Sequence, residues 1–418
     1  MTDAYDALET RDPAVREAAL LAALPGYIAH AQQHTAAFAQ LLAGIDATRI
    51  TSRAALATLP VTRKSQLLER QQAQRASQPM GGFNAHRWGA DMPRVFASPG
   101  PIYEPEGRRS DYWRMARALY AAGFRAGDLV HNCFSYHFVP AGAMLESGAL
   151  ALGCTVFAGG TGQTELQVQA MAELRPQGYV GTPSFLKLIV EKAHSLGLPL
   201  SSLRKALVSG EACPPSLCAW FATQGIAVFQ CYATADLGLI AYETAARQGL
   251  VVDEQVLVEI VRPGTGDPVP DGEVGELVVT NFNPDYPLIR FGTGDLSAIL
   301  PGPCPSGRTN TRIAGWMGRA DQTTKVRGMF VHPSQVAQVA RRFPAVRKAR
   351  VVVTGSMGSD EMTLHAEVAP DVADTGALAA ALASAMREVT KLRAQVQLCA
   401  LGSLPNDGKV IEDARSYT

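Results

Sequence analysis

Tyr232, Thr234 and Asp236 place a phenol, a hydroxyl and a carboxylate at alternate positions in the middle of the chain. They follow the apolar residues around Val228 and precede Gly238, so the pattern predicts a buried strand that opens into a turn. Groups of these three kinds at the end of a strand can bind a nucleotide. Taken alone, the residues favour a simpler interpretation, a capped loop with a locally satisfied Thr and Asp. A nucleotide site gains its support from other stretches.

One of these stretches is a turn rich in proline and glycine, which follows a short predicted strand within residues 94–107. Backbone N–H groups in such a turn can contact a phosphate. A dedicated phosphate loop would also carry a lysine and several hydroxyls. Here Ser98 is the one small hydroxyl residue, and Glu104 and Glu106 would repel an anion. A phosphate-binding turn and a plain turn therefore both remain open.

The segment from Asp111 to about residue 250 alternates predicted strands and helices. Residues 179–184 and 206–211 each combine a strand with a polar turn, and a helix follows. This alternation is typical of a layered α/β domain with largely parallel strands, in which ligands bind at the carboxyl ends of the strands. The polar turns all fall at such ends, so we expect the site there.

The flanking segments have different patterns. Residues 13–80 are Ala- and Gln-rich with apolar residues three and four apart, which predicts helices, and we assign no chemistry to them. From Val251 the residues alternate and carry Gly-Asp turns, which indicates antiparallel strands. A small α+β unit follows Asp321, with strands near 351–354 and 363–368.

Composition limits the class of protein. In the 418 residues, 38 Lys and Arg balance 38 Asp and Glu, so no basic excess indicates a nucleic-acid partner. The start is acidic and no apolar run is long enough to span a membrane, which predicts a cytoplasmic protein. Charged residues are 18%, below the usual ~25%, which leaves apolar surface for a homodimer interface. The seven cysteines show no C-x-x-C spacing, so we expect neither a disulfide framework nor a zinc site.

Taken together, these motifs resemble the adenylate-forming (AMP-binding) superfamily and, within it, the phenylacetate–coenzyme A ligase branch. The resemblance covers roughly residues 90–415. Its most specific parts are Ile289-Arg-Phe-Gly-Thr-Gly-Asp295, Gly318-Arg-Ala-Asp-Gln-Thr-Thr-Lys-Val-Arg-Gly328 and Val331-His-Pro-Ser-Gln335.

The resemblance implies an α/β fold: a large N-terminal domain with layered, mostly parallel sheets and a β subdomain, and a small α+β C-terminal lid. We expect the N-terminal domain at 1–320, with a helical start at 1–90, an α/β core at 91–250 and a β-rich part at 251–320. The lid is expected at 321–418.

The implied activity is that of an acid–thiol ligase. Such enzymes use ATP and Mg²⁺ to convert a carboxylic acid, here an aryl or short acyl acid, into an acyl-adenylate, and coenzyme A then takes the acyl group. The expected partners are thus the acid and coenzyme A, with neither nucleic acid nor membrane. A carrier-protein thiol is another acceptor that the same site could use. The alternative is a catalytically weak or inactive relative that binds a nucleotide or acyl-CoA as a sensor.

The resemblance also implies roles for single residues. Asp295 would bind the ribose hydroxyls, because a carboxylate after a glycine turn suits a bidentate acceptor. Arg319 would contact the nucleotide, Asp321 would be the hinge, and Lys409 would reach the acyl–phosphate oxygens and stabilise their developing charge. Asp236 would bind magnesium, with Thr234 beside it. The remaining residues would line the nucleotide (Ser98, Gly100, Ser209, Gly210, Glu211, Tyr232 and Ala233) or the acyl pocket (Tyr136, Thr182 and Pro183).

The sequence departs from the family pattern in three places. The phosphate loop is Ser98-Pro-Gly-Pro-Ile-Tyr-Glu-Pro105, without the family's lysine and most of its hydroxyls. Ala235 replaces a small hydroxyl residue, and Asp236 replaces a Glu that is one methylene longer. The residues after Tyr242 supply no Cys/His zinc site of the kind some relatives carry. The altered loop favours the inactive alternative, whereas the retained Asp295, Arg319 and Lys409 favour catalysis.

Overall fold

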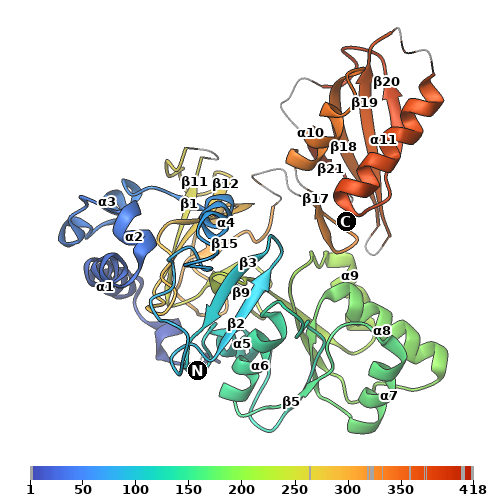
Figure 1. The fold of residues 1–418 in the computed structure, drawn as a ribbon. Coiled ribbons are helices and arrows are strands. Elements are labelled where there is room, and N and C mark those ends of the chain that lie inside the picture. Colours follow the sequence, from blue (N-terminus) through green and yellow to red (C-terminus); the bar gives the residue numbers. More distant parts are fainter. Residues whose placement is uncertain are drawn as a thin grey trace. The chain divides into compact units, whose positions relative to one another are not determined.

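The structure is a computed structural model that describes residues 3–262, 265–317, 320, 324–331, 333–356, 359–370, 372, 374–405 and 410–415. The chain divides into two compact units, Met1–Gly318 and Arg319–Thr418 (Figure 1). The sheets mix parallel and antiparallel pairs and are covered by helices, which confirms the expected α/β class. Among the described residues, no helix is both long and apolar enough to cross a membrane.

The N-terminal unit is built on a long sheet with strand order β14-β15-β10-β9-β8-β7-β6-β4-β5. Five strands are parallel, as the alternating pattern predicted: β4 (Leu129–Asn132), β5 (Thr155–Ala158), β6 (Gly178–Gly181), β7 (Lys205–Val208) and β8 (Ala227–Thr234). The remaining strands are antiparallel: β9 (Gly238–Glu243), β10 (Leu250–Val252), β14 (Ile299–Leu300) and β15 (Arg312–Ile313). The long sheet therefore changes from parallel to antiparallel pairing at β8.

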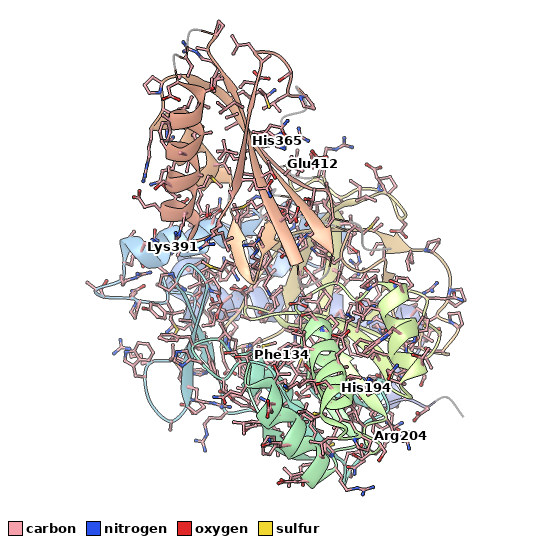
Figure 2. The ribbon with its side chains drawn as sticks, turned by 90° about the vertical axis from the view of Figure 1, so that its right-hand side faces the viewer. Phe134, His194, Arg204, His365, Lys391 and Glu412 are labelled. Carbon is pink, nitrogen blue, oxygen red and sulfur yellow. The ribbon has the colours of Figure 1, made fainter. Side chains whose placement is uncertain are left out.

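Four helices connect the parallel strands: α6 (Ala141–Ala151), α7 (Thr164–Leu174), α8 (Pro183–Leu196) and α9 (Pro215–Thr223), and α5 (Met115–Ala121) precedes β4. The hydrophobic faces of these helices pack on the sheet around buried side chains such as Val130, Leu186 and Leu207. Figure 2 labels Phe134, in the turn after β4, and His194, in the last turn of α8.

A second sheet has the strand order β1-β13-β12-β11, with β1 (Thr62–Arg63), β13 (Phe291–Ser297), β12 (Gly275–Asn281) and β11 (Val256–Val261). Its later strands are antiparallel, as predicted, and β1 pairs in parallel with β13. Helices surround β1: α1 (Pro13–His34), α2 (Ala36–Leu41), α3 (Arg53–Ala57) and α4 (Lys64–Ala73). The predicted helical start is thus packed on the second sheet.

Arg290 anchors this N-terminal segment. Its side chain is 1% exposed and its guanidinium donates to the carbonyls of Ala57 and Leu59 at 2.7 and 2.6 Å. The same group pairs with Glu259 and donates to the Gly266 carbonyl at 2.7 Å. Because a buried charge needs several partners to offset its desolvation, this network fixes α3 and β1 against β13.

The proline-rich turn is shorter than the sequence suggested. β2 (Arg94–Ser98) and β3 (Ile102–Glu106) form an antiparallel hairpin in which Ser98 pairs with Ile102. Residues 99–101 alone form the turn, so Glu104 and Glu106 lie on a strand and both are buried. Their alternate positions on β3 turn both carboxylates to one face.

The C-terminal unit is the predicted α+β unit. Its sheet has the order β20-β19-β18-β21, with β18 (Val346–Ser356), β19 (Ser359–Val368), β20 (Gln395–Cys399) and β21 (Ile411–Asp413). Its helices are α10 (Pro333–Arg341) and α11 (Thr375–Thr390), and β16 (Thr324–Val326) pairs with β17 (Met329–Val331).

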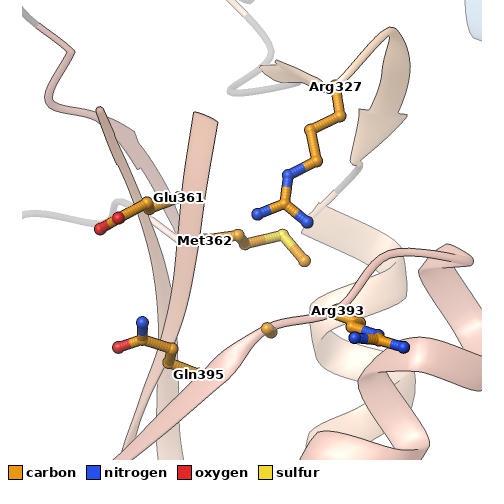
Figure 3. Close-up of a pocket in the computed structure, with 6 residues that line it drawn as sticks. Arg327, Glu361, Met362, Arg393 and Gln395 are labelled. Atoms are coloured by element: carbon orange, nitrogen blue, oxygen red, sulfur yellow. The ribbon is translucent and has the colours of Figure 1, made fainter. Parts of the chain in front are cut away.

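The surface of this unit carries its own ion pairs and a shallow hollow. Arg350 and Glu412, the latter labelled in Figure 2, join β18 and β21 at 2.5 Å. A hollow of about 340 Å³ lies between Arg327, Glu361, Met362 and Arg393 (Figure 3). Arg327 already donates to the Asp360 carbonyl at 2.9 Å, so one wall is held by contacts within the unit.

Candidate active site

The carboxyl ends of the parallel strands carry the predicted site residues. Tyr136 lies in the turn after β4, Thr182 after β6, Ser209 after β7, and Thr234 ends β8. Because these strands are neighbours in one sheet, their ends form one edge, as expected for ligand binding in an α/β sheet.

The turn after β7 is linked to β8 by a hydrogen bond. The Ser209 hydroxyl donates to the Cys231 carbonyl at 2.8 Å, which ties the turn to the next strand. Gly210 has a φ of +80°, in the left-handed region that favours glycine. Glu211 follows, and its Oε2 is buried without a hydrogen-bond partner. The turn thus leaves one unsatisfied acceptor beside Ser209.

Thr234 and Gly238 shape the turn that presents Asp236. The Thr234 hydroxyl accepts from the Leu237 N–H at 3.1 Å, which is the local capping that the simpler interpretation expected. Gly238 has a φ of +74°, and a Cβ there would meet the Trp113 carbonyl oxygen at 2.8 Å. Thr234 pairs with Gly238, and just outside the turn Ala233 pairs with Leu239 across the β8–β9 hairpin. Asp236 is therefore fixed at the tip of a tight turn.

Asp295 is the meeting point of three segments. It lies on β13, is 8% exposed, and accepts hydrogen bonds from the Tyr232 hydroxyl at 2.5 Å and from the Trp316 indole N–H at 3.1 Å. The two donors bind different carboxylate oxygens, so the carboxylate plane is fixed. The structure brings Tyr232 and Asp295 together, as a shared nucleotide site requires. Trp316 was missed, because a single indole in a glycine-rich stretch carries no signal of its own.

Asp236 lies in a group of charged side chains that also includes the buried Glu104 and the partly exposed Lys64, to which the sequence assigned no binding role. It is 4% exposed, and the Lys64 ammonium lies 2.7 Å from its Oδ2. Lys64 is the first residue of α4, in the region to which the sequence interpretation assigned no chemistry. Pairing of β1 with β13 brings it to the site from 172 residues away in the chain.

Glu104 is the other unassigned member of this group. It is 2% exposed, and its Oε1 accepts from the Ser98 hydroxyl at 2.5 Å. Burial, and next the charge of Asp236, raise the pKa of Glu104 to about 8. The sequence predicted this residue to be part of the proline-rich turn, where its charge would repel an anion. The structure has it buried on β3, so a carboxyl group rather than an ammonium lies on the strand after the proline-rich turn.

The acyl-pocket residues lie at the ends of β4 and β6. The Tyr136 hydroxyl accepts from the Asn132 amide at 2.8 Å, and burial together with Glu146 raises its pKa. Thr182 caps α8, and Pro183 is its first residue. Gly100 lies at the tip of the β2–β3 turn. Three predicted residues, Arg319, Asp321 and Lys409, lie outside the described residues.

Comparison with known proteins identifies the family. Residues 110–283 match the AMP-binding enzyme family model, and residues 328–413 match the AMP-binding enzyme C-terminal domain. A phenylacetate-coenzyme A ligase of Aromatoleum evansii is 30% identical over 344 residues, covering 78% of this chain and 76% of that protein. The chain belongs to the phenylacetate–coenzyme A ligase family of AMP-binding enzymes. The enzyme of that name from Thermus thermophilus is 32% identical over 343 residues, covering 78% of this chain and 75% of its own.

Solved structures of other enzymes share the fold of this chain. A 2-hydroxyisobutyryl-CoA ligase in complex with 2-HIB-AMP and CoA has a TM-score of 0.81 and 25% identity, covering 98% of this chain and 92% of that one. An amide bond synthetase of Marinactinospora thermotolerans, at 19% identity and a TM-score of 0.54, shares the fold. The suspected superfamily and branch are therefore confirmed.

The family implies magnesium beside the nucleotide phosphates, and the described residues fit such an ion. Asp236 keeps one buried oxygen, Oδ1, without a hydrogen-bond partner. Magnesium prefers oxygen ligands and binds through one or two carboxylates together with substrate phosphates. The Asp236 Oδ1 is an oxygen of the kind that such an ion takes, on a side chain one methylene shorter than the family's Glu.

Proposed function

We propose that this protein activates a carboxylic acid with ATP, forms an acyl-adenylate and transfers the acyl group to coenzyme A. The acid is an aryl or short acyl acid. The observation that carries the proposal is Asp295, held between Tyr232 and Trp316 at the strand ends of a phenylacetate–coenzyme A ligase family member. Such a fixed carboxylate is a preorganised acceptor for two vicinal hydroxyls.

The nucleotide is bound by residues from three strand ends. Asp295 accepts the ribose hydroxyls, and Ser209, Gly210 and Glu211 line the adenine with Tyr232 and Ala233. The unsatisfied Oε2 of Glu211 supports this role, because a buried acceptor needs a donor and the adenine amino group can supply one. Ser98 and Gly100 contact the phosphates.

The acid and the lid complete the reaction. Tyr136, Thr182 and Pro183 line the acyl pocket, so the carboxylate lies near the turn that carries Thr234. Asp236 holds magnesium, which when bound offsets the charge of the phosphates. Arg319 contacts the nucleotide, Asp321 is the hinge between the two half-reactions, and Lys409 stabilises the charge that develops on the acyl–phosphate oxygens.

A pyrophosphate-release assay tests the proposal directly. We expect release that depends on the acid, across a panel that contains phenylacetate, benzoate, 2-hydroxyisobutyrate and acetate, and thioester formation when coenzyme A is added. The variant that tests the role of Asp295 is Asp295→Asn, which keeps the shape of the side chain and removes its charge. Acid-dependent release by the wild type that is equal in this variant would remove Asp295 from the nucleotide site.

A specific observation favours a second candidate, a catalytically weak relative that binds a nucleotide or acyl-CoA as a sensor. Glu104 puts a carboxyl group beside Asp236 where the phosphates would lie. The sensor would bind AMP without releasing pyrophosphate for any acid. Calorimetry with AMP alongside the release assay therefore separates the two candidates.

We also propose an oligomeric state, a cellular location and the absence of a nucleic-acid partner. The low charged fraction supports a homodimer, and the balanced charge supports the absence of a nucleic-acid partner. The acidic start supports a cytoplasmic protein. Light scattering at two protein concentrations tests the dimer, because a monomer would keep a single mass of about 44.5 kDa.

A further inference from the structure

Glu104 and Asp236 place two buried acceptors opposite each other. Glu104 Oε1 is occupied by Ser98 and Asp236 Oδ2 by Lys64, whereas Glu104 Oε2 and Asp236 Oδ1 have no hydrogen-bond partner. The two carboxyl groups lie within hydrogen-bonding reach of each other. Two carboxylates cannot donate to one another and repel each other, and either a proton or a metal ion shared between them would relieve that repulsion.

A third buried oxygen lies in the same neighbourhood. Tyr286 is 1% exposed, its hydroxyl has no hydrogen-bond partner, and the charges of Asp236 and Glu104 act on it. A proton shared by the two carboxyl groups would satisfy both of them, but the Tyr286 hydroxyl would still have no hydrogen-bond partner. A cation with one or more waters would also offer the hydroxyl a partner, because a magnesium ion usually keeps several waters in its shell.

We propose that Glu104 and Asp236 together form a divalent-cation site that binds Mg²⁺ or Mn²⁺ before any nucleotide arrives. The inference rests on the proposed function, because it completes the phosphate end of the same nucleotide site. The proline-rich turn then acts through a metal rather than through a lysine. Strand β3 supplies one carboxylate, the β8–β9 turn supplies the other, and the nucleotide phosphates bind to the remaining positions of the ion.

The charges around Asp236 support this arrangement. Lys64 neutralises one of the two carboxylates, which leaves a net charge of about −1 in a buried place if Glu104 is ionised. A triphosphate would be repelled by that charge, whereas a divalent ion reverses its sign. The site therefore selects the metal first and the phosphates second.

Titration of Mn²⁺ into nucleotide-free protein tests the inference, with free Mn²⁺ followed by electron paramagnetic resonance. We expect about one ion bound per chain, displaced by excess Mg²⁺, and affinity lowered by roughly tenfold or more in Glu104→Gln, as for the loss of a group that supports a metal. The matched control is Glu106→Gln, two residues along the same strand, where the carboxylate pairs with Arg94. This control should bind Mn²⁺ like the wild type.

Two results would overturn the inference. One is that the nucleotide-free wild-type protein binds no Mn²⁺ between pH 6 and pH 9. That result would show that a proton, and not a metal ion, is shared by Glu104 and Asp236. The other is equal affinity in Glu104→Gln and the wild type. If Glu104→Gln does not fold, the wild-type titration still decides, and Mn²⁺ should also raise the unfolding temperature of the wild type. Pyrophosphate release without this metal binding would contradict the inference alone, whereas metal binding without release for any acid would contradict the proposed function alone.

Discussion

Replacement of Glu104 by Gln should change how the stability of the N-terminal unit depends on pH. In the folded, metal-free protein, burial and the charge of Asp236 raise the pKa of Glu104 from 4.5 to about 8. The unfolded chain has the ordinary value, so between these two pH values the folded state holds a proton that the unfolded state has lost. Stability is therefore lost as pH rises from 4.5 to about 8, and the contribution is constant above that range.

The size of the effect follows from the same two values. Each pKa unit corresponds to about 1.4 kcal/mol, so the rise from 4.5 to about 8 costs the folded protein on the order of 5 kcal/mol at most. Other buried acids contribute in the same direction, among them Asp111, whose pKa burial raises to about 6. The quantity to compare is therefore the difference between Glu104→Gln and the wild type, in which these shared contributions cancel.

Urea unfolding at pH 5, 6.5 and 8.5, with a chelator present, measures this difference. All four tryptophans, at 88, 113, 220 and 316, lie in the N-terminal unit, so their fluorescence follows that unit alone. We expect Glu104→Gln to gain several kcal/mol over the wild type between pH 5 and pH 8.5, and Glu106→Gln to show no such gain. Parallel profiles for Glu104→Gln and the wild type would refute the burial and coupling of Glu104.

Three further predictions concern the nucleotide, the lid and the N-terminal anchor. Asp295→Ala should weaken AMP binding by about 1.5–3 kcal/mol, as for a hydrogen bond to a charged group; unchanged affinity in calorimetry would contradict the ribose role. Lys409→Ala should slow adenylate formation by orders of magnitude and leave thioester formation from preformed adenylate nearly intact; equal loss in both half-reactions would exclude the lid assignment. Arg290→Met should lower the unfolding free energy by about 3–5 kcal/mol, because Glu259 and three carbonyls lose a buried partner. Urea unfolding measures this loss. A loss below about 1 kcal/mol would show that water replaces the guanidinium.

Much of the fold could be predicted because its signals are local. The alternation of strands and helices across residues 111–250 and the antiparallel pattern after Val251 depend on neighbours in sequence, and the sheet order agrees with both. The family resemblance implied that Tyr232 and Asp295 line the same nucleotide, and the hydrogen bond between them is a finding of the structure.

The rest of the candidate site depends on contacts that local patterns do not contain. Lys64 begins an ordinary surface-like helix, and its role appears only when β1 pairs with β13. Glu104 was expected to be a turn residue, because prolines on both sides hid the second strand of the hairpin. Burial changes the chemical behaviour of Glu104. In a turn it would be a solvated charge, whereas on β3 it is a buried acceptor beside Asp236.

The Arg290 anchor also bears on how the chain folds during synthesis. The carbonyl of Ala57 can accept its hydrogen bond only after Arg290, 233 residues further along the chain, has been synthesised. At the usual rate of 5–20 residues per second, that interval lasts roughly 10 to 50 seconds. Throughout it the N-terminal helices have left the ribosome without the sheet that covers their apolar side chains, among them Leu24, Ile28 and Phe38. The segment that supplies Lys64 is thus the one that a chaperone has the longest time to bind.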